Sequence, residues 1–317
     1  MFILYINDLP EICNESEIYL FADDAKMFNH VKSVADSLKL QASLNEMQDW
    51  SEKWLLKLNI KKCKIISFGR NVDNDFKYYI TNNNTIHKLE RENNINDLGI
   101  LLDNKLNFSA HIQAKINKAF SMIGLLKRNF RHLNLSSFVT LYKCMVRSHL
   151  DYCNSVWAPY KIGDIEDIEK VQKRATKIIP ALKGLTYVER LKRCNLSTLR
   201  FRRIRGDMIE TYKIITGKYD RNVSPKFSFS EVTSTRGNSL KINTTRTKYD
   251  LRKYCFTNRV VNVWNSLPDH IVKACTLNQF KNRLDKFWSC QEMFYDFKSG
   301  LTGTGSRSEI GYDLDLN

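Results

Sequence analysis

The chain has 317 residues, of which 43% are hydrophobic, with only 12 glycines and 5 prolines; this composition excludes a disordered or fibrous protein and leaves room for two or three compact units. The formal net charge of +16 combines −3 in residues 1–100 with +19 in residues 101–317. An excess of that size attracts polyanions, above all nucleic-acid phosphates, or forms a solvated surface.

The ends and the cysteines indicate the compartment. The opening apolar run, residues 1–6, is too short for a signal peptide or a membrane span. The eight cysteines show no paired CxxC spacing. We therefore expect reduced thiols in an intracellular protein, cytoplasmic or nuclear, with no membrane partner.

Residues 1–103 have the pattern of mixed helix and strand. The apolar run 18–21 is followed by Ala22-Asp23-Asp24, which predicts two strands meeting at an acidic turn. Ser33 is placed to cap a helix. Its apolar positions recur at helical spacing: Leu40, Leu44, Met47, Trp50 and Trp54. Short strands are predicted at 64–68, 77–80 and 98–102, with an Asn-rich turn at 82–85.

From Phe108 the apolar period becomes helical. One stripe consists of Phe108, Ile112, Ile116, Phe120, Ile123 and Phe130. Basic residues lie largely off this stripe, at Lys115, Lys118, Lys127 and Arg128. Further helices are predicted from near Ser136 to Trp157, from a cap at Asp164 to Pro180, and over 196–215.

The last third alternates between polar and apolar stretches. Residues 216–248, which include the run 233–238, read as a linker or surface loop. Residues 254–288 regain apolar periodicity, which predicts helices interrupted at Pro268. The small, polar end after Gly300 is expected to fray.

Adjacent carboxylates after an apolar strand are the first chemical signal. Asp23 and Asp24 repel each other unless a cation lies between them, and a divalent metal is a natural candidate. In two-metal phosphoryl transfer, carboxylates hold the ions that activate the 3′-hydroxyl and stabilise the leaving group. Oxygen ligands suit Mg²⁺. Taken alone, such a pair is more often a solvated turn.

Three other groups of residues have alternative interpretations. Cys144, His149 and Cys153 have spacings compatible with zinc on one helical face, but helix packing explains them better. The tryptophans are suited to stacking on bases, yet a buried core is the commoner role. The basic cluster is either a nucleic-acid contact or a solvated face, and contact is favoured; it comprises Arg200, Arg202, Arg203 and Arg205.

Several segments resemble jockey-like non-LTR retrotransposon reverse transcriptases in the order that those proteins show. Their sequences are Tyr5-Ile-Asn-Asp-Leu-Pro10, Tyr19-Leu-Phe-Ala-Asp-Asp-Ala25, Leu58-Asn-Ile-Lys-Lys-Cys-Lys64 and Asp97-Leu-Gly-Ile100. Later ones are Leu141-Tyr-Lys143, Leu150-Asp-Tyr-Cys153, Val156-Trp157, Val171-Gln-Lys-Arg-Ala175, Arg252-Lys-Tyr254, Phe256-Thr-Asn-Arg259 and Val263-Trp-Asn-Ser-Leu-Pro268. The resemblance spans most of residues 3–290.

The resemblance implies a fragment of an RNA-directed DNA polymerase that performs template-dependent nucleotidyl transfer with Mg²⁺. In it, Asp23 and Asp24 would be the catalytic metal ligands, with Phe21 and Ala22 beside the nucleotide site. Leu98, Gly99 and Ile100 would position the primer end. The basic helices would lie along an RNA–DNA duplex of RNA template and DNA primer, through phosphate and sugar contacts. Protein partners are not indicated.

The implied fold is α+β and predominantly α. It comprises a partial palm of short antiparallel strands and a helix at 1–103, and a basic thumb-like helical bundle at 104–217. A polar linker or loop follows at 218–248, then a helical C-terminal region at 249–290 and a mostly disordered tail at 291–317.

The chain departs from the family pattern at its start. The family's earlier palm aspartate, its fingers and a Gly-rich segment are not found from Met1 onward, so we expect the isolated chain to be inactive. The alternative is a non-catalytic basic remnant that still binds nucleic acid. A third hypothesis, a decayed genomic copy with no cellular role, is not separated from the second by sequence.

Overall fold

The computed structural model describes residues 5–13, 15–69, 75–82, 85–130, 132–230 and 238–302. The chain forms two compact units, Met1–Leu106 and Asn107–Asn317. Helices predominate and the strands are few and short, which confirms the mainly helical α+β class. No described helix has both the length and the apolar character that crossing a bilayer requires.

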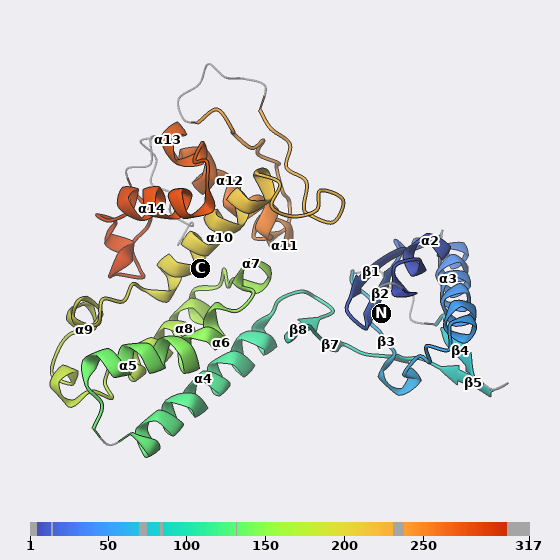
Figure 1. Cartoon of the computed structure of the whole chain (residues 1–317), viewed down its shortest axis with the longest axis horizontal. Helices are drawn as coiled ribbons and strands as arrows, with labels where there is room; N and C mark the ends of the chain where they lie inside the picture. The colour runs from blue at the N-terminus through green and yellow to red at the C-terminus, as the bar shows by residue number, and fades with distance from the viewer. Residues whose placement is uncertain are drawn as a thin grey trace. The chain divides into compact units, whose positions relative to one another are not determined.

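The first unit contains helix α2 (Leu9–Ile12), strands β1 (Glu17–Phe21) and β2 (Asp24–Phe28), and helix α3 (Val34–Lys53). The two strands pair antiparallel, with Phe21 opposite Asp24, so the predicted strand–turn–strand at the acidic pair is confirmed. In Figure 1 this hairpin lies beside α3. The hairpin is therefore supported on one face by a long helix.

Helix α3 begins where its cap was predicted. The Ser33 hydroxyl accepts from the backbone N–H of Asp36, and the Asp36 carboxylate accepts from the N–H of Ser33, which makes a capping box. Met47 and Trp50 of this helix are buried with Leu9 in a small core. Ile18, Leu20 and Met27 from the inner face of the hairpin pack against that core.

The remaining strands of this unit form three further pairs: β3 (Lys64–Ile65) with β6 (Glu90–Arg91), β4 (Tyr79–Asn82) with β5 (Thr85–Lys88), and β7 (Asn94–Asp97) with β8 (Ile100–Asp103). The strand predicted at 64–68 is shorter than expected. The strand predicted at 98–102 is corrected, because Leu98 and Gly99 form the turn between β7 and β8. Within the predicted Asn-rich turn, residues 83–84 lie outside the described residues.

The second unit begins with the helix predicted from the stripe after Phe108. This helix, α4 (Ser109–Asn129), buries Ile112, Ile116 and Ile123. In Figure 1, α4 and α8 (Ile162–Ala175) lie side by side. Helix α8 starts two residues before the predicted cap, so Asp164 stands in its first turn, where a carboxylate favours the helix dipole.

The helix predicted from Ser136 to Trp157 is broken. It consists of α5 (Leu135–Leu141), a π-helical turn (Tyr142–Arg147), α6 (Ser148–Asp151) and α7 (Asn154–Trp157). The break between the last two comes at Cys153, whose φ of 49° lies in the left-handed region that a helix cannot continue through. Because the helix breaks there, α7 packs against α10 (Leu199–Ile215).

Helix α10 is central to the second unit. Its Phe201, Met208 and Tyr212 share one core with Trp264, Phe280 and Trp288. Trp264 lies in α12 (Phe256–Ser266), Phe280 lies in α14 (Leu277–Phe287), and Trp288 follows α14 directly. The short helices α11 (Asp250–Lys253) and α13 (Asp269–Val272) precede α12 and α14, and α9 (Tyr187–Cys194) precedes α10. Pro268 interrupts them as predicted, between α12 and α13.

Parts of the predicted linker or loop and of the predicted tail pack against the core of the second unit. The stretch 218–248 is anchored where it is described: Ile242 is buried, and Asn238 donates to the carbonyls of Trp264 and Leu267. Within the predicted tail, Met293 and Leu301 are buried in the α10 core. Residues 231–237 and 303–317, which hold the rest of the polar run and of the tail, lie outside the described residues.

Candidate functional site

The acidic turn is exposed at the tip of the β1–β2 hairpin. Ala22 and Asp23 are the two central residues, and Ala22 adopts a φ of 52°. A left-handed conformation costs a non-glycine residue about 1–2 kcal/mol. Strand pairing and the apolar residues packed beneath the hairpin offset this cost. They hold the turn in this conformation, with its side chains in solvent.

Alternation along the strands separates the two faces of this hairpin. Ile18 and Leu20 face the core, whereas Tyr19 and Phe21 face outward, and Phe21 is 62% exposed. The Tyr19 ring meets Phe28 edge-to-face, with ring centroids 5.5 Å apart. An exposed aromatic surface therefore adjoins the exposed carboxylates of Asp23 and Asp24.

An ion pair joins the acidic hairpin to the β7–β8 hairpin. Lys26 Nζ in β2 lies 2.6 Å from Asp97 Oδ1, and Asp97 immediately precedes the Leu98-Gly99 turn. Such a half-exposed pair adds at most about 1 kcal/mol. The pair connects two segments that are some 70 residues apart in the sequence. The sequence analysis assigned both segments to the same polymerase site.

The β7–β8 turn has both central residues in the left-handed region. Leu98 has a φ of 45° and Gly99 a φ of 81°, the pattern of a two-residue hairpin turn whose twist matches the strands. Gly99 adopts this conformation without a Cβ penalty, whereas Leu98 does not. Ile100 is buried, so of the three residues predicted to position a primer, Leu98 is the exposed side chain.

The donor chemistry of this site suits Mg²⁺ only in part. Asp23 and Asp24 supply oxygen ligands at an exposed position, as a hard cation requires. Among the described residues, no group of three or more His, Cys, Asp or Glu side chains is arranged to hold a metal. No such group therefore forms at Cys144, His149 and Cys153, and both cysteines are exposed.

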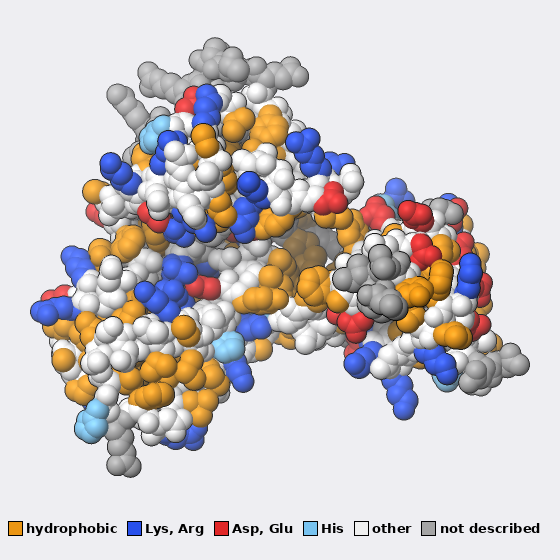
Figure 2. Space-filling model, viewed as in Figure 1, with side chains coloured by type: hydrophobic (Ala, Val, Ile, Leu, Met, Phe, Trp, Pro, Cys, Tyr) orange, Lys and Arg blue, Asp and Glu red, His pale blue; other side chains and the backbone are white. Residues whose placement is uncertain are grey.

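The basic residues predicted on α4 are mostly accessible. Lys118, Lys127 and Arg128 are exposed, and the last two stand in the final turn, where cations favour the helix dipole. Lys115 is half-buried, with its ammonium 5.9 Å from the Tyr152 ring centroid. On the face drawn in Figure 2, Lys and Arg side chains are spread over the helical unit and do not form one patch.

The arginines of α10 that were predicted to contact nucleic acid are buried or paired with carboxylates. Arg200 and Arg203 are 6% and 4% exposed, so neither presents its charge to a nucleic-acid surface. Arg202 is bonded to Asp151 and Arg205 to Asp285. Arg200 and Arg203 are buried and Arg202 and Arg205 are paired, because α10 packs against other helices on more than one side.

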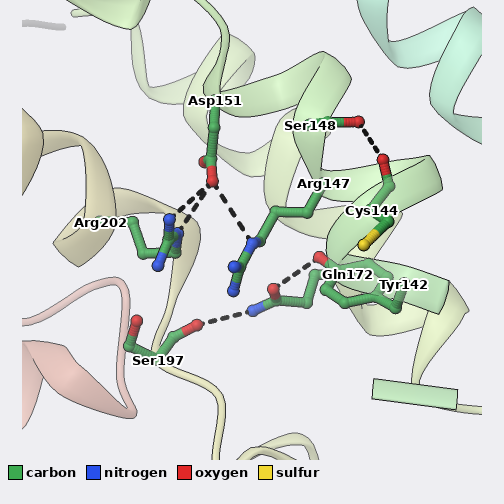
Figure 3. Close-up of polar contacts among 8 residues, drawn as sticks. All are labelled: Tyr142, Cys144, Arg147, Ser148, Asp151, Gln172, Ser197 and Arg202. Atoms are coloured by element: carbon green, nitrogen blue, oxygen red, sulfur yellow. Dashed lines mark hydrogen bonds and ion pairs between the residues drawn. The ribbon is translucent and has the colours of Figure 1, made fainter. Parts of the chain in front are cut away.

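Figure 3 shows how one of these arginines is held. Asp151 accepts from Arg202 at 3.0 and 2.8 Å and lies 3.3 Å from Arg147 Nε. Below it, Gln172 accepts from the Tyr142 hydroxyl and donates to the carbonyl of Ser197. Asp151 lies within a segment that carries the family resemblance. No feature of the sequence around it indicates that it pairs with Arg202, 51 residues later.

A second buried pair was also missed by the sequence analysis. Arg259 donates from Nε and Nη2 to the two carboxylate oxygens of Asp207, at 2.8 and 2.9 Å, and both side chains are about 5% exposed. Burial raises the pKa of Asp207, and the Arg259 charge opposes that rise. Arg259 also donates to the Ser155 carbonyl, so it ties α12 to α10 and α7.

One buried histidine begins α4. Burial, with a contribution from Lys115, lowers the pKa of His111 to about 4, and its ring centroid lies 5.1 Å from that of Trp157. The imidazole is therefore neutral at physiological pH. Its position inside the fold gives it a packing role.

The comparisons with known proteins connect the chain to mobile elements. It is 26% identical over 184 residues to an RNA-directed DNA polymerase from mobile element jockey of Drosophila funebris. It is 22% identical over 191 residues to a probable RNA-directed DNA polymerase from transposon X-element of Drosophila melanogaster. The chain is distantly related to these reverse transcriptases.

Each of these similarities covers 56% of this chain but only 19% or 20% of the polymerase. An uncharacterized protein of Caenorhabditis elegans is 31% identical over 130 residues, which are 40% of this chain and 66% of that protein. No family model matches the chain. No solved structure matches it either.

Proposed function

We propose that this chain is part of an RNA-directed DNA polymerase of a non-LTR retrotransposon, with the first unit as the end of its palm. The observation that carries the proposal is the exposed Ala22-Asp23 turn, joined through Lys26–Asp97 to the Leu98-Gly99 turn. The distant relationship to jockey and X-element polymerases supports it. The second unit would be the thumb and the region after it.

In this proposal, the residues of the first unit hold the metal ion and orient the nucleotide and the primer end. Asp23 and Asp24 are the metal ligands that this chain contributes, and Mg²⁺ bound there would neutralise charge on the reacting phosphates. Phe21 and Ala22 border the nucleotide site. The Leu98-Gly99 turn, with Ile100 buried beneath it, positions the primer end. The Lys26–Asp97 ion pair links the two hairpins that carry these turns.

The second unit supplies the nucleic-acid interface. Its exposed α4 cations, Lys118, Lys127 and Arg128, are suited to phosphates of an RNA template paired with a DNA primer. Lys115 lies on the same helix and is partly covered. Arg200 and Arg203 are not included, because they are buried.

Metal binding at the hairpin tests the proposal directly. Mn²⁺ titrated into the isotopically labelled protein should broaden the amide NMR signals of residues 22–24 before others, since paramagnetic relaxation acts locally. Asp23→Asn and Asp24→Asn should remove the effect. Asp49→Asn, at an exposed position of α3, is the control and should retain it. Broadening spread over all acidic residues, unchanged by the hairpin variants, would refute the metal assignment.

A primer-extension assay tests the expected inactivity. The 317-residue chain contributes two ligand carboxylates, so with Mg²⁺, an RNA template and a DNA primer we expect no incorporation above background. Incorporation that disappears in Asp23→Ala would show that the chain is a complete catalyst. The metal-binding proposal would survive that result, and the proposal of inactivity would not.

A non-catalytic nucleic-acid-binding protein is the second candidate, favoured by the exposed cations of α4 and the +19 charge after residue 100. The logarithm of its affinity for duplex DNA should fall with log salt by about 0.9 per phosphate neutralised. Lys127→Met with Arg128→Met should reduce that slope by about 2. Affinity that does not change with salt would reject this candidate.

A further inference from the structure

Arg147 is a half-buried arginine at the end of the π-helical turn of the second unit. Its side chain is 14% exposed. Its Nε atom is enclosed by the protein, whereas Nη1 and Nη2 retain accessible surface and have no hydrogen-bond acceptor among the described residues. Figure 3 draws the side chain with one contact, the ion pair between Nε and Asp151. The two terminal nitrogens are therefore open to a ligand at the surface.

The carboxylate beside Arg147 is already bonded to a second arginine. Asp151 Oδ2 accepts from Nε and Nη2 of Arg202 at 3.0 and 2.8 Å. The same oxygen lies 3.3 Å from Arg147 Nε, in an ion pair that is not a hydrogen bond. One carboxylate thus faces two guanidinium groups, which leaves a surplus of one positive charge.

The pKa of Arg147 reflects this surplus. Burial lowers the pKa most, and the Arg202 charge lowers it more than the Asp151 charge raises it. Arg205, on the next turn of α10, is different because Asp285 is its own partner and accepts from two of its nitrogens. A guanidinium with a net positive surrounding is stabilised when an anion is added beside it.

The short helix α6 connects Arg147 to the cations of α4. Helix α6 begins directly after Arg147 and packs against α4. On α6, burial and then the charges of Lys118 and Lys115 lower the pKa of His149. The Lys115 ammonium also lies 5.9 Å from the ring centroid of Tyr152, the residue that follows α6. A nucleic-acid backbone in contact with these α4 cations therefore lies close to α6, at whose start Arg147 stands.

We propose that Arg147 binds a backbone phosphate of the RNA–DNA duplex, beside the contacts made by α4. A phosphodiester carries one negative charge, which matches the surplus of the group formed by Arg147, Asp151 and Arg202. The two terminal nitrogens of a guanidinium match two oxygens of a phosphate. The inference rests on the proposed nucleic-acid interface of the second unit and is independent of metal binding by the first.

Duplex binding by the full chain tests the assignment. The fluorescence anisotropy of a labelled RNA–DNA duplex gives the affinity at a series of salt concentrations. Arg147→Met should lower the affinity about tenfold at low salt, since charge-assisted hydrogen bonds are lost. It should also reduce the slope of log affinity against log salt by about 1, because one phosphate contact disappears. Arg205→Met is the control: it removes the same charge from a one-to-one pair with Asp285 and should leave affinity and slope unchanged.

Asp151→Asn separates an effect of charge from an effect of structure. It removes the carboxylate that offsets Arg147 and Arg202, so the affinity should rise about threefold or more at low salt, with a steeper slope. A substitution that only loosened the fold would lower the affinity instead. Circular dichroism confirms that each variant is folded. Should Arg147→Met not fold, the direction of the change in Asp151→Asn decides by itself.

Equal affinity and slope in Arg147→Met and the unaltered protein would overturn the proposal, as would a loss of affinity in Asp151→Asn. If Lys127→Met with Arg128→Met still reduces the slope in that case, the interface on α4 stands and the Arg147 contact alone fails. No binding of the duplex by the unaltered protein would overturn the inference together with that interface. The metal assignment in the first unit would remain, because the Mn²⁺ titration tests it separately.

Discussion

The acidic turn of the first unit and the arginine cluster of the second are both short runs of like charge, yet they have opposite surroundings. Asp23 and Asp24 are exposed at a hairpin tip, whereas Arg200 and Arg203 are buried along α10. A two-residue turn leaves its side chains in solvent. A central helix turns successive residues through every direction, so some of its charges must enter the core.

The same substitution in both regions gives the largest contrast. Asp207→Asn should cost about 3–5 kcal/mol of unfolding free energy, because it leaves the buried Arg259 without its ionic partner. Asp23→Asn should change stability by less than about 0.5 kcal/mol, since exposed positions tolerate such changes. Urea unfolding measures both. A small loss in Asp207→Asn would mean that the pair is solvated and that the two regions do not differ.

Acid should weaken the second unit through His111. Because its folded pKa of about 4 lies below the ordinary value of 6.5, the unfolded chain binds the proton first. Stability is fully retained above pH 6.5 and declines towards pH 4, by about 2–3 kcal/mol. Unfolding at pH 7 and pH 4.5 should show a smaller decline in His111→Gln. Equal declines in the two proteins would assign the acid sensitivity to other groups.

The smallest expected effect concerns the turn beside the acidic hairpin. Gly99→Ala forces a Cβ into the left-handed region at a φ of 81° and should cost about 1 kcal/mol. Gly124→Ala is the control: the residue lies within α4, a Cβ added there would meet open space, and the change should stabilise by about 0.5–1 kcal/mol. If both changes stabilise, the turn does not require the conformation that the structure shows.

Local chemistry was the part that could be predicted. The strands on either side of Asp23, the cap at Ser33 and the interruption at Pro268 each depend on a few adjacent residues, and all three are present. The contacts that could not be predicted depend on packing between segments that are distant in the sequence. Met293 is ordered because its side chain enters the α10 core, and no residue near it in the sequence indicates that.

The sequence by itself determined the helical class, the exposed acidic turn and the concentration of positive charge after residue 100. The helical class and the turn follow from the spacing of residues that are close in the sequence. The charge follows from composition alone. Only the tertiary structure decided that Arg202 pairs with Asp151, that Arg259 pairs with Asp207, and that Arg203 is buried. The two partners of each ion pair are some 50 residues apart in the sequence. Only the packing of the helices brings them together and buries them.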